Sequence, residues 1–175
     1  IMHSSYVRFV AHPNSALPPD RANKAMQNFT PWFPIEHVPV FLAGVFVVQH
    51  LAGAMTLICD GDFGDGKLLV LRFERFEAVS IHEEFAHPWP GESGDRLLPK
   101  SPGTSWTFPF LKVENSLWAA NSVQAITFAD TPHHYCIISG SDIVDVLSLE
   151  PPQVTWTTSA EASFVMDAIG RLGAV

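Results

Sequence analysis

The residues best suited to chemistry in this chain are concentrated in one six-residue segment, His82-Glu83-Glu84-Phe85-Ala86-His87. Imidazoles and carboxylates are the side chains from which many zinc sites are built. The spacing differs from the helical motif H-E-x-x-H, whose two histidines are four residues apart and meet one ion. Histidines five residues apart lie about 140° apart around a helix and on opposite faces of a strand. We therefore interpret the segment first as a solvated strand end that runs into a loop.

A second pair of histidines, His133 and His134, lies at the start of an apolar segment. Neighbouring residues of a strand point to opposite faces, so at most one of the two serves a given site. A metal site would have to gather side chains that are distant in sequence, namely His82, Glu83, His87 and His134. A metal-dependent enzyme that uses these residues is our alternative hypothesis for the function.

Other catalytic patterns find little support. The turn Asp60–Lys67 is rich in Asp and Gly, but its oxygen ligands do not follow the EF-hand spacing, and it is typical of a hairpin. The sequence contains no G-x-S-x-G, Walker or G-x-G-x-x-G motif. Cys59 and Cys136 lie in apolar runs typical of buried thiols, and whether they pair is open. We expect no cofactor.

Aromatic side chains are abundant, with 13 Phe, 5 Trp and 2 Tyr. Several lie in or beside a Pro- and Gly-rich segment at 87–104, and long loops in compact domains are often functional. These rings either cover the ends of a sheet or form an apolar pocket or partner-binding patch. On the second interpretation, the ligand- or partner-binding residues are Trp89, Trp106, Phe108 and His87.

Composition limits the class of protein. With 175 residues, of which 47% are hydrophobic and 16% charged, we expect one globular domain over 1–175. The formal net charge of -8 argues against a nucleic-acid groove. The apolar stretch Val38–Cys59 contains Gln49-His50 at its centre and has no flanking Lys or Arg, so we predict buried strands and no membrane span. No signal-peptide pattern opens the sequence, and we expect a cytoplasmic location.

Periodicity predicts mostly strands, near 40–48, 52–59, 68–82, 134–139, 142–149 and 153–157, with a β-bulge near Arg75 or Ala78. A short helix is predicted from Asp20 to Phe29. Thr158-x-x-Glu161 matches a capping box that would begin a C-terminal helix. The predicted fold is α+β: a bent, mainly antiparallel sheet or partial barrel with flanking N- and C-terminal helices.

Two segments carry a resemblance, Phe110–Trp118 and His133–Trp156. Their order is Ser-x-Trp, then His-Tyr, then Asp-Val-Leu-Ser, then Glu-Pro-Pro-x-Val-x-Trp. This pattern resembles that of small, uncharacterised bacterial proteins. The resemblance implies a β-rich fold and no known activity, so it brings no catalytic residues.

These observations favour a non-catalytic binding domain for a protein partner or an apolar small molecule. An immunity-like bacterial binding protein is one concrete form of this hypothesis. The acidic charge suits a basic partner, because charge complementarity raises the rate of association. A purely structural subunit is a third possibility.

Overall fold

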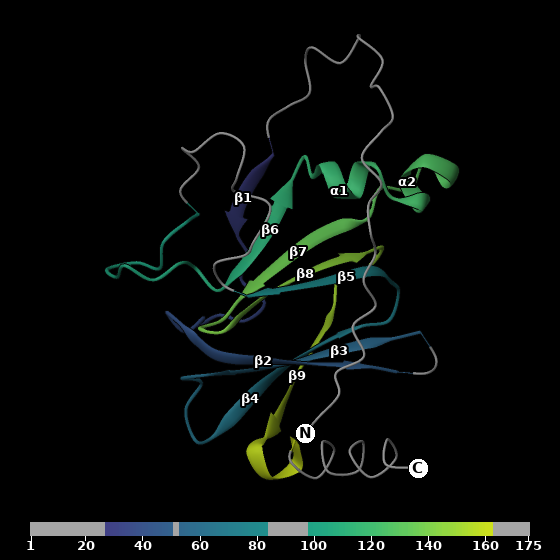
Figure 1. Cartoon of the computed structure of the whole chain (residues 1–175). Helices are drawn as coiled ribbons and strands as arrows, with labels where there is room; N and C mark the ends of the chain where they lie inside the picture. The colour runs from purple at the N-terminus through teal and green to yellow at the C-terminus, as the bar shows by residue number, and fades with distance from the viewer. Residues whose placement is uncertain (1–26, 51–52, 84–97, 163–175) are drawn as a thin grey trace.

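Nine β-strands dominate the computed structural model, which describes residues 27–50, 53–83 and 98–162. They pair antiparallel in two sheets (Figure 1). The five-stranded sheet contains, in order, β1 (Asn28–Pro31), β6 (Phe110–Glu114), β7 (His133–Ile138), β8 (Asp142–Ser148) and β5 (Phe76–Glu83). The four-stranded sheet contains β2 (Leu42–Gln49), β3 (Met55–Gly61), β4 (Lys67–Phe73) and β9 (Gln153–Thr158). Two short helices, α1 (Leu117–Ala120) and α2 (Val123–Phe128), connect β6 to β7.

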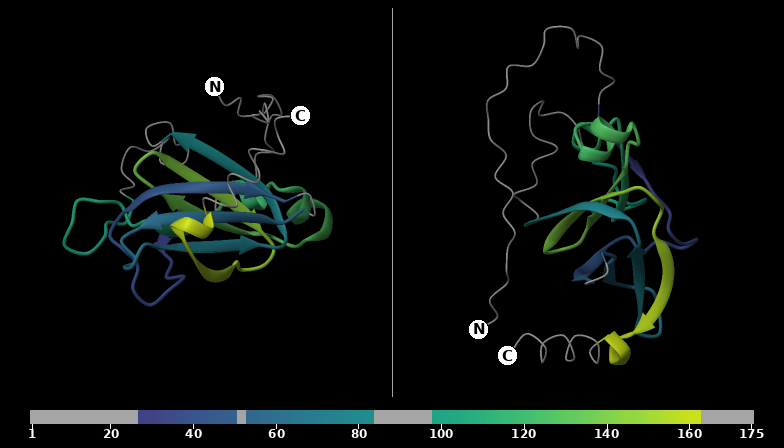
Figure 2. Two further views of the ribbon diagram at one scale, coloured as in Figure 1. Left: turned by 90° about the horizontal axis from the view of Figure 1, so that it is seen from below. Right: turned by 90° about the vertical axis from the view of Figure 1, so that its right-hand side faces the viewer.

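The two sheets form separate layers that share an apolar core (Figures 1 and 2). The ring of Phe73 on β4 meets the ring of Tyr135 on β7, with centroids 5.5 Å apart. Tyr135 therefore points toward the four-stranded sheet. Because strand residues alternate between faces, its neighbours His134 and Cys136 point to the opposite face of the five-stranded sheet.

That opposite face is also buried. Its residues on β6, β7 and β8 include Leu111, Cys136, Ile143 and Leu147, all at most 3% exposed. Both faces of β7 and β8 are thus removed from water, which explains why their sequences are almost continuously apolar. A polar side chain on this face needs a partner inside the protein, because an unpaired buried polar group is costly.

The predicted fold class is wrong: the structure is a mainly antiparallel two-sheet β fold. Neither sheet closes on itself or joins the other, so no partial barrel forms among the described residues. Phe29, the last residue of the predicted N-terminal helix, lies in β1 opposite Val113, so strand pairing overrides its helical spacing. Residues 20–26 of that prediction lie outside the described part.

The C-terminal flanking helix is described only for its first turn, at residues 159–162, and the rest of the prediction falls on residues not described. The capping box is confirmed. The Thr158 N–H donates to Glu161 Oε2 at 3.0 Å, and the Glu161 N–H donates to Thr158 Oγ1 at 3.3 Å. The Thr158 N–H, and after it the Thr157 hydroxyl, which donates to Glu161 Oε2 at 3.1 Å, lower the pKa of the Glu161 carboxyl because they favour its charged form.

Several local predictions are confirmed, and others are wrong. The apolar stretch Val38–Cys59 supplies the strands β2 and β3, but the prediction that both are buried is wrong for β2, most of whose residues are half-buried or exposed. Separately, no helix in the described ranges is long and apolar enough to cross a membrane. β3 and β4 are joined by the acidic turn, and β7 and β8 by the turn at Gly140. The prediction of one strand over 68–82 is wrong, because the chain divides at Glu74-Arg75 into β4 and β5, which belong to different sheets. The predicted irregularity near Ala78 is confirmed by a register shift between Phe76 and Ala78.

Candidate functional site

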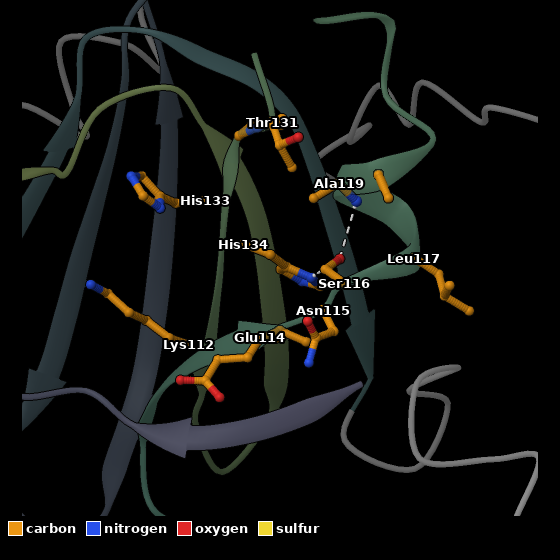
Figure 3. A pocket seen from close by; sticks show the side chains of 12 residues that line it. Lys112, Glu114, Asn115, Ser116, Leu117, Ala119, Thr131, His133 and His134 are labelled. Atoms are coloured by element: carbon orange, nitrogen blue, oxygen red, sulfur yellow. Dashed lines mark hydrogen bonds between the residues drawn. The ribbon is translucent and has the colours of Figure 1, made fainter. Parts of the chain in front are cut away.

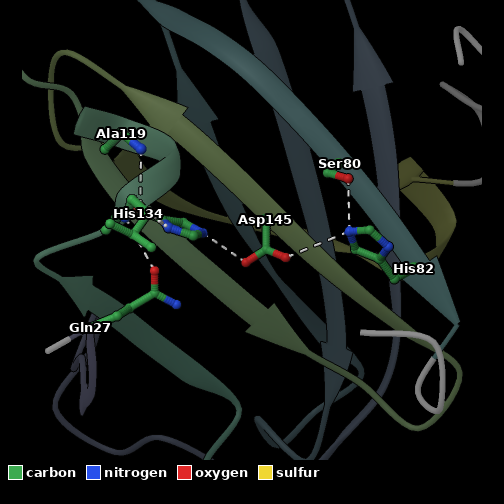
Figure 4. A network of polar contacts seen from close by, with 8 residues as sticks. Gln27, Ser80, His82, Ala119, His134 and Asp145 are labelled. Carbon is green, nitrogen blue, oxygen red and sulfur yellow. Dashed lines mark hydrogen bonds and ion pairs between the residues drawn. The ribbon is translucent and has the colours of Figure 1, made fainter. Parts of the chain in front are cut away.

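A buried network of polar side chains is centred on Asp145, in the middle of β8. Asp145 is fully buried and lies opposite Cys136 of β7 and Ser80 of β5 in the sheet register. Its Oδ1 is 2.8 Å from His134 Nε2 (Figure 4). The His134 side chain is itself fully buried. A buried carboxylate in this position is tolerated because the His134 imidazole is hydrogen-bonded to it.

His82 approaches the same carboxylate from the other side. Its Nε2 lies 4.0 Å from Asp145 Oδ2 and 2.8 Å from Ser80 Oγ. The structure therefore brings together two of the four predicted metal ligands, His82 and His134, through a residue that the sequence interpretation had not selected. Glu83 is exposed at the end of β5, and His87 lies outside the described residues. Within the described ranges, no three His, Cys, Asp or Glu side chains form a group that could hold a metal ion.

On its far side, His134 contacts Ser116, at a sharp turn from strand to helix. β6 ends at Glu114, Asn115 adopts a left-handed conformation with φ of 54°, and Ser116 is the N-cap of α1. The Ser116 Oγ accepts a hydrogen bond from the Ala119 N–H at 3.1 Å and lies 2.8 Å from His134 Nδ1. Ser116, His134 and Asp145 thus form a continuous chain of hydrogen bonds.

A pocket of about 480 Å³ opens beside this chain (Figure 3). Its volume falls in the range typical of small-molecule sites. Ser116 and His134 belong to its wall, together with residues of β6, α1 and the segment before β7. The other lining residues are Lys112, Val113, Glu114, Asn115, Leu117, Ala119, Ala120, Thr131, Pro132 and His133.

The two cysteines do not pair; both are free and buried. Burial raises the pKa of the Cys59 thiol. It also raises the pKa of the Cys136 thiol, and the charge of Asp145 and a hydrogen bond to it add to the effect. Both side chains are therefore neutral near pH 7 and unsuited to nucleophilic chemistry.

The helices α1 and α2 expose a group of large apolar side chains that we call the helical apolar surface: Leu117, Val123, Ile126 and Phe128. The three side chains of α2 are 67%, 70% and 64% exposed, in chain order, and α2 buries none of its residues. The sequence interpretation missed this surface. Its available signal was Ser122, a good N-cap residue, followed by apolar residues three apart.

The predicted aromatic residues lie in a second apolar area. Trp106 is 51% exposed, and its ring lies 4.6 Å from that of Phe41. Phe108 is buried, and its ring packs against Phe33 at 5.2 Å. The structure thus places Trp106 at the surface and Phe108 in the core, whereas Trp89 lies outside the described residues.

Comparison with known proteins reveals no relationship, since no family model, curated protein or solved structure matches the chain. The resemblance to small bacterial proteins stays a prediction.

Proposed function

We propose that this protein is a binding domain for a protein partner, which docks on the helical apolar surface. The observation that carries the proposal is the exposure of Val123, Ile126 and Phe128, each at least 64% exposed on a helix that buries nothing. Val123 and Ile126 are three residues apart and lie on one side of α2, whereas Phe128, two residues after Ile126, points to another side. Large apolar side chains exposed together on one side of a helix are typical of an interaction site.

The fold itself does not require apolar residues on α2. A six-residue helix is unstable in isolation. Here it is held by the Ser122 cap, whose Oγ accepts from the Ala125 N–H at 3.2 Å, and by Glu77 Oε1, which accepts from the Gln124 N–H at 3.2 Å. Polar residues at positions 123, 126 and 128 would be compatible with all these contacts. The apolar side chains therefore serve contacts outside the described fold.

Charge indicates the kind of partner. Glu77, Glu114 and Asp130 lie at or next to the two helices, and the chain carries a net charge of -8. The second oxygen of Glu77, Oε2, is buried and has no hydrogen-bond partner within the described ranges. The nearby cation Lys112 already lies over the Tyr135 ring, 5.5 Å from its centroid. A partner that combines apolar side chains with Lys or Arg would complement this surface.

A second candidate interface is the area around Trp106. Tryptophan is enriched among the residues that dominate the binding energy of interfaces. Val40, whose carbonyl accepts a hydrogen bond from the Ser101 hydroxyl, is also 46% exposed. A partner could dock on this area in place of the helical apolar surface, so a variant in each of the two surfaces distinguishes the two interfaces.

The test uses two fluorescent amphipathic helical peptides, one of Leu, Ala and Lys and one with Glu replacing each Lys. Fluorescence anisotropy of the full chain should show tighter binding to the Lys peptide. Val123→Asp should weaken this binding by roughly tenfold, because it places a charge in the apolar contact. Asp is favourable in the first turn of a helix, so the variant should keep α2 intact.

The matched control is Val40→Asp, which places the same charge near Trp106. It should change binding to the Lys peptide by less than about twofold. If Val40→Asp weakens binding and Val123→Asp does not, the second interface is the correct one. Equal binding of the two peptides, or no effect of either variant, contradicts the proposal.

A further inference from the structure

We propose that Ser116 is a nucleophile that is acylated by small carboxylic esters bound in the adjacent pocket, with His134 as its general base and Asp145 as the positioning residue. Ser116, His134 and Asp145 are joined by two contacts of 2.8 Å. The Ser116 end of this hydrogen-bonded series lines a pocket of about 480 Å³. This arrangement of roles defines a catalytic triad, whatever the fold that carries it.

The protonation pattern follows from the hydrogen bonds. An ionised carboxylate only accepts, so the Nε2–H of His134 donates to Asp145 Oδ1. The Nδ1 of this neutral tautomer carries a lone pair and faces Ser116 Oγ, from which it accepts the hydroxyl proton. A general base needs this arrangement: one nitrogen held by a carboxylate and the other available to the nucleophile.

The position of Ser116 resembles that of nucleophiles on strand-to-helix turns. Asn115, with φ of 54°, is one of three non-glycine residues in the described ranges with positive φ. Such backbone conformations are often found at functional sites. Ser116 is 5% exposed and lines the pocket, and the His134 side chain to which it is hydrogen-bonded is fully buried, so an ester would approach the Ser116 Oγ from the pocket (Figure 3).

The helix cap alone does not explain the histidine. Ser122 caps α2 as Ser116 caps α1, with its Oγ accepting from the N–H three residues later. No imidazole is hydrogen-bonded to Ser122 among the described residues, and the α2 cap is formed nevertheless. The hydrogen bonds of the His134–Asp145 pair are therefore not required for Ser116 to cap its helix.

A donor for the developing oxyanion is also present. The Leu117 N–H, on the residue after Ser116, donates to Gln27 Oε1 at 3.3 Å (Figure 4 shows Gln27). This N–H would serve an oxyanion only once the Gln27 side chain has moved away from it. A backbone N–H at this point in the chain is the type of donor that stabilises the tetrahedral intermediate of acyl transfer.

The proposed step balances in atoms and charge. Ser116 Oγ bonds to the ester carbonyl carbon while its proton moves to His134 Nδ1. The bond from that carbon to the alcohol oxygen breaks, and the alcohol leaves with the proton. Water, deprotonated by the same nitrogen, then attacks the acyl-serine, releasing the carboxylic acid and returning the proton to Ser116 Oγ.

The test is labelling of the full chain with a fluorescent fluorophosphonate, followed by peptide mass mapping, and hydrolysis of p-nitrophenyl acetate. The label should lie on Ser116, and Ser116→Ala should abolish labelling and reduce hydrolysis by at least about 100-fold. Ser122→Ala removes an equivalent cap and should keep both activities within about twofold. Ser116→Asn, which keeps a good N-cap without a hydroxyl, should behave like Ser116→Ala.

Asp145→Asn tests the positioning role. It should lower the hydrolysis rate and shift its pH profile, because an amide does not stabilise the imidazolium that forms when His134 takes the proton. A wild-type chain that takes no label, label on another residue, or equal loss in Ser116→Ala and Ser122→Ala would overturn the proposal. Mass mapping of the wild-type chain gives a result even if a variant fails to fold.

Discussion

At the scale of single residues, Asp145 lies between two histidines, His134 and His82. It is fully buried, and it accepts from His134 and lies 4.0 Å from His82. We expect Asp145→Ala to lower the free energy of unfolding by about 3 kcal/mol, because it leaves a buried imidazole N–H without an acceptor. Urea denaturation followed by circular dichroism measures this change.

Asp142, at the start of the same strand, provides the control. Its Oδ2 accepts from the Ser141 Oγ at 2.8 Å in an exposed position. Asp142→Ala should change the free energy of unfolding by less than about 0.5 kcal/mol. If Asp145→Ala lowered the free energy of unfolding as little as Asp142→Ala does, the Asp145 network would not contribute to stability.

Two members of this network were selected from the sequence, but as metal ligands. His82 and His134 were selected for their chemistry, and the structure joins them through Asp145. Asp145 itself carried a signal, since one acidic residue inside the run Ile143-Val-Asp-Val-Leu147 must find a partner if the strand is buried. Ser116 had no comparable signal, because its contact with His134 spans 18 residues and depends on the pairing of β6 with β7.

At the scale of elements, α2 ends on an unfavourable residue. Ala129, its C-cap, has a left-handed conformation with φ of 56°. Glycine adopts this conformation without steric cost, whereas alanine loses roughly 1 kcal/mol there. We expect Ala129→Gly to stabilise the protein by about 0.5–1 kcal/mol, measured as a rise in the thermal unfolding midpoint of a few degrees.

Ala125 lies inside the same helix, where the same substitution to glycine should have the opposite effect on stability. Glycine at an interior helical position costs about 1 kcal/mol relative to alanine, so Ala125→Gly should lower the midpoint. Hydrogen exchange of the α2 amides should change in the same directions. If both substitutions lower the midpoint equally, the left-handed cap does not strain the helix.

Elements with a local signal were predicted well, and the others were not. The β3–β4 and β7–β8 hairpins combine apolar strands with turn residues, and both were expected. The change of sheet at Glu74-Arg75 was seen only as an irregularity, because nothing local shows which partner a strand will take. Phe29 had helical spacing, yet it pairs with Val113, which lies 84 positions later in the chain.

At the scale of the whole molecule, the distribution of apolar residues explains why the fold class was mispredicted. The chain passes between the two sheets from β1 to β2, from β4 to β5 and from β8 to β9. Hydrophobic alternation predicts strands, but it does not assign them to layers. The β-rich character was therefore predictable, whereas the two-sheet arrangement depends on pairings between distant segments.

The burial of two thiols makes the free energy of unfolding of the whole molecule sensitive to alkaline pH. Burial raises the pKa of both thiols, Cys59 and Cys136, so the folded state retains protons that the unfolded chain releases above about pH 8.5. Unfolding is thus coupled to proton release, and the free energy of unfolding should fall as pH rises, by up to about 1.4 kcal/mol per pH unit for each thiol. Burial also raises the pKa of Tyr135 to about 12, which extends the loss above pH 10.

Urea denaturation in reducing buffer at pH 7, 8, 9 and 10 measures this dependence. The double variant Cys59→Ala/Cys136→Ala is the control: smaller core side chains lower its stability at every pH, but its curve should be nearly flat between pH 8 and 10. If wild type and double variant lose stability with the same slope, the thiols are not the groups responsible. The slope reports proton release alone, so it separates the titration of the buried thiols from their contribution to packing.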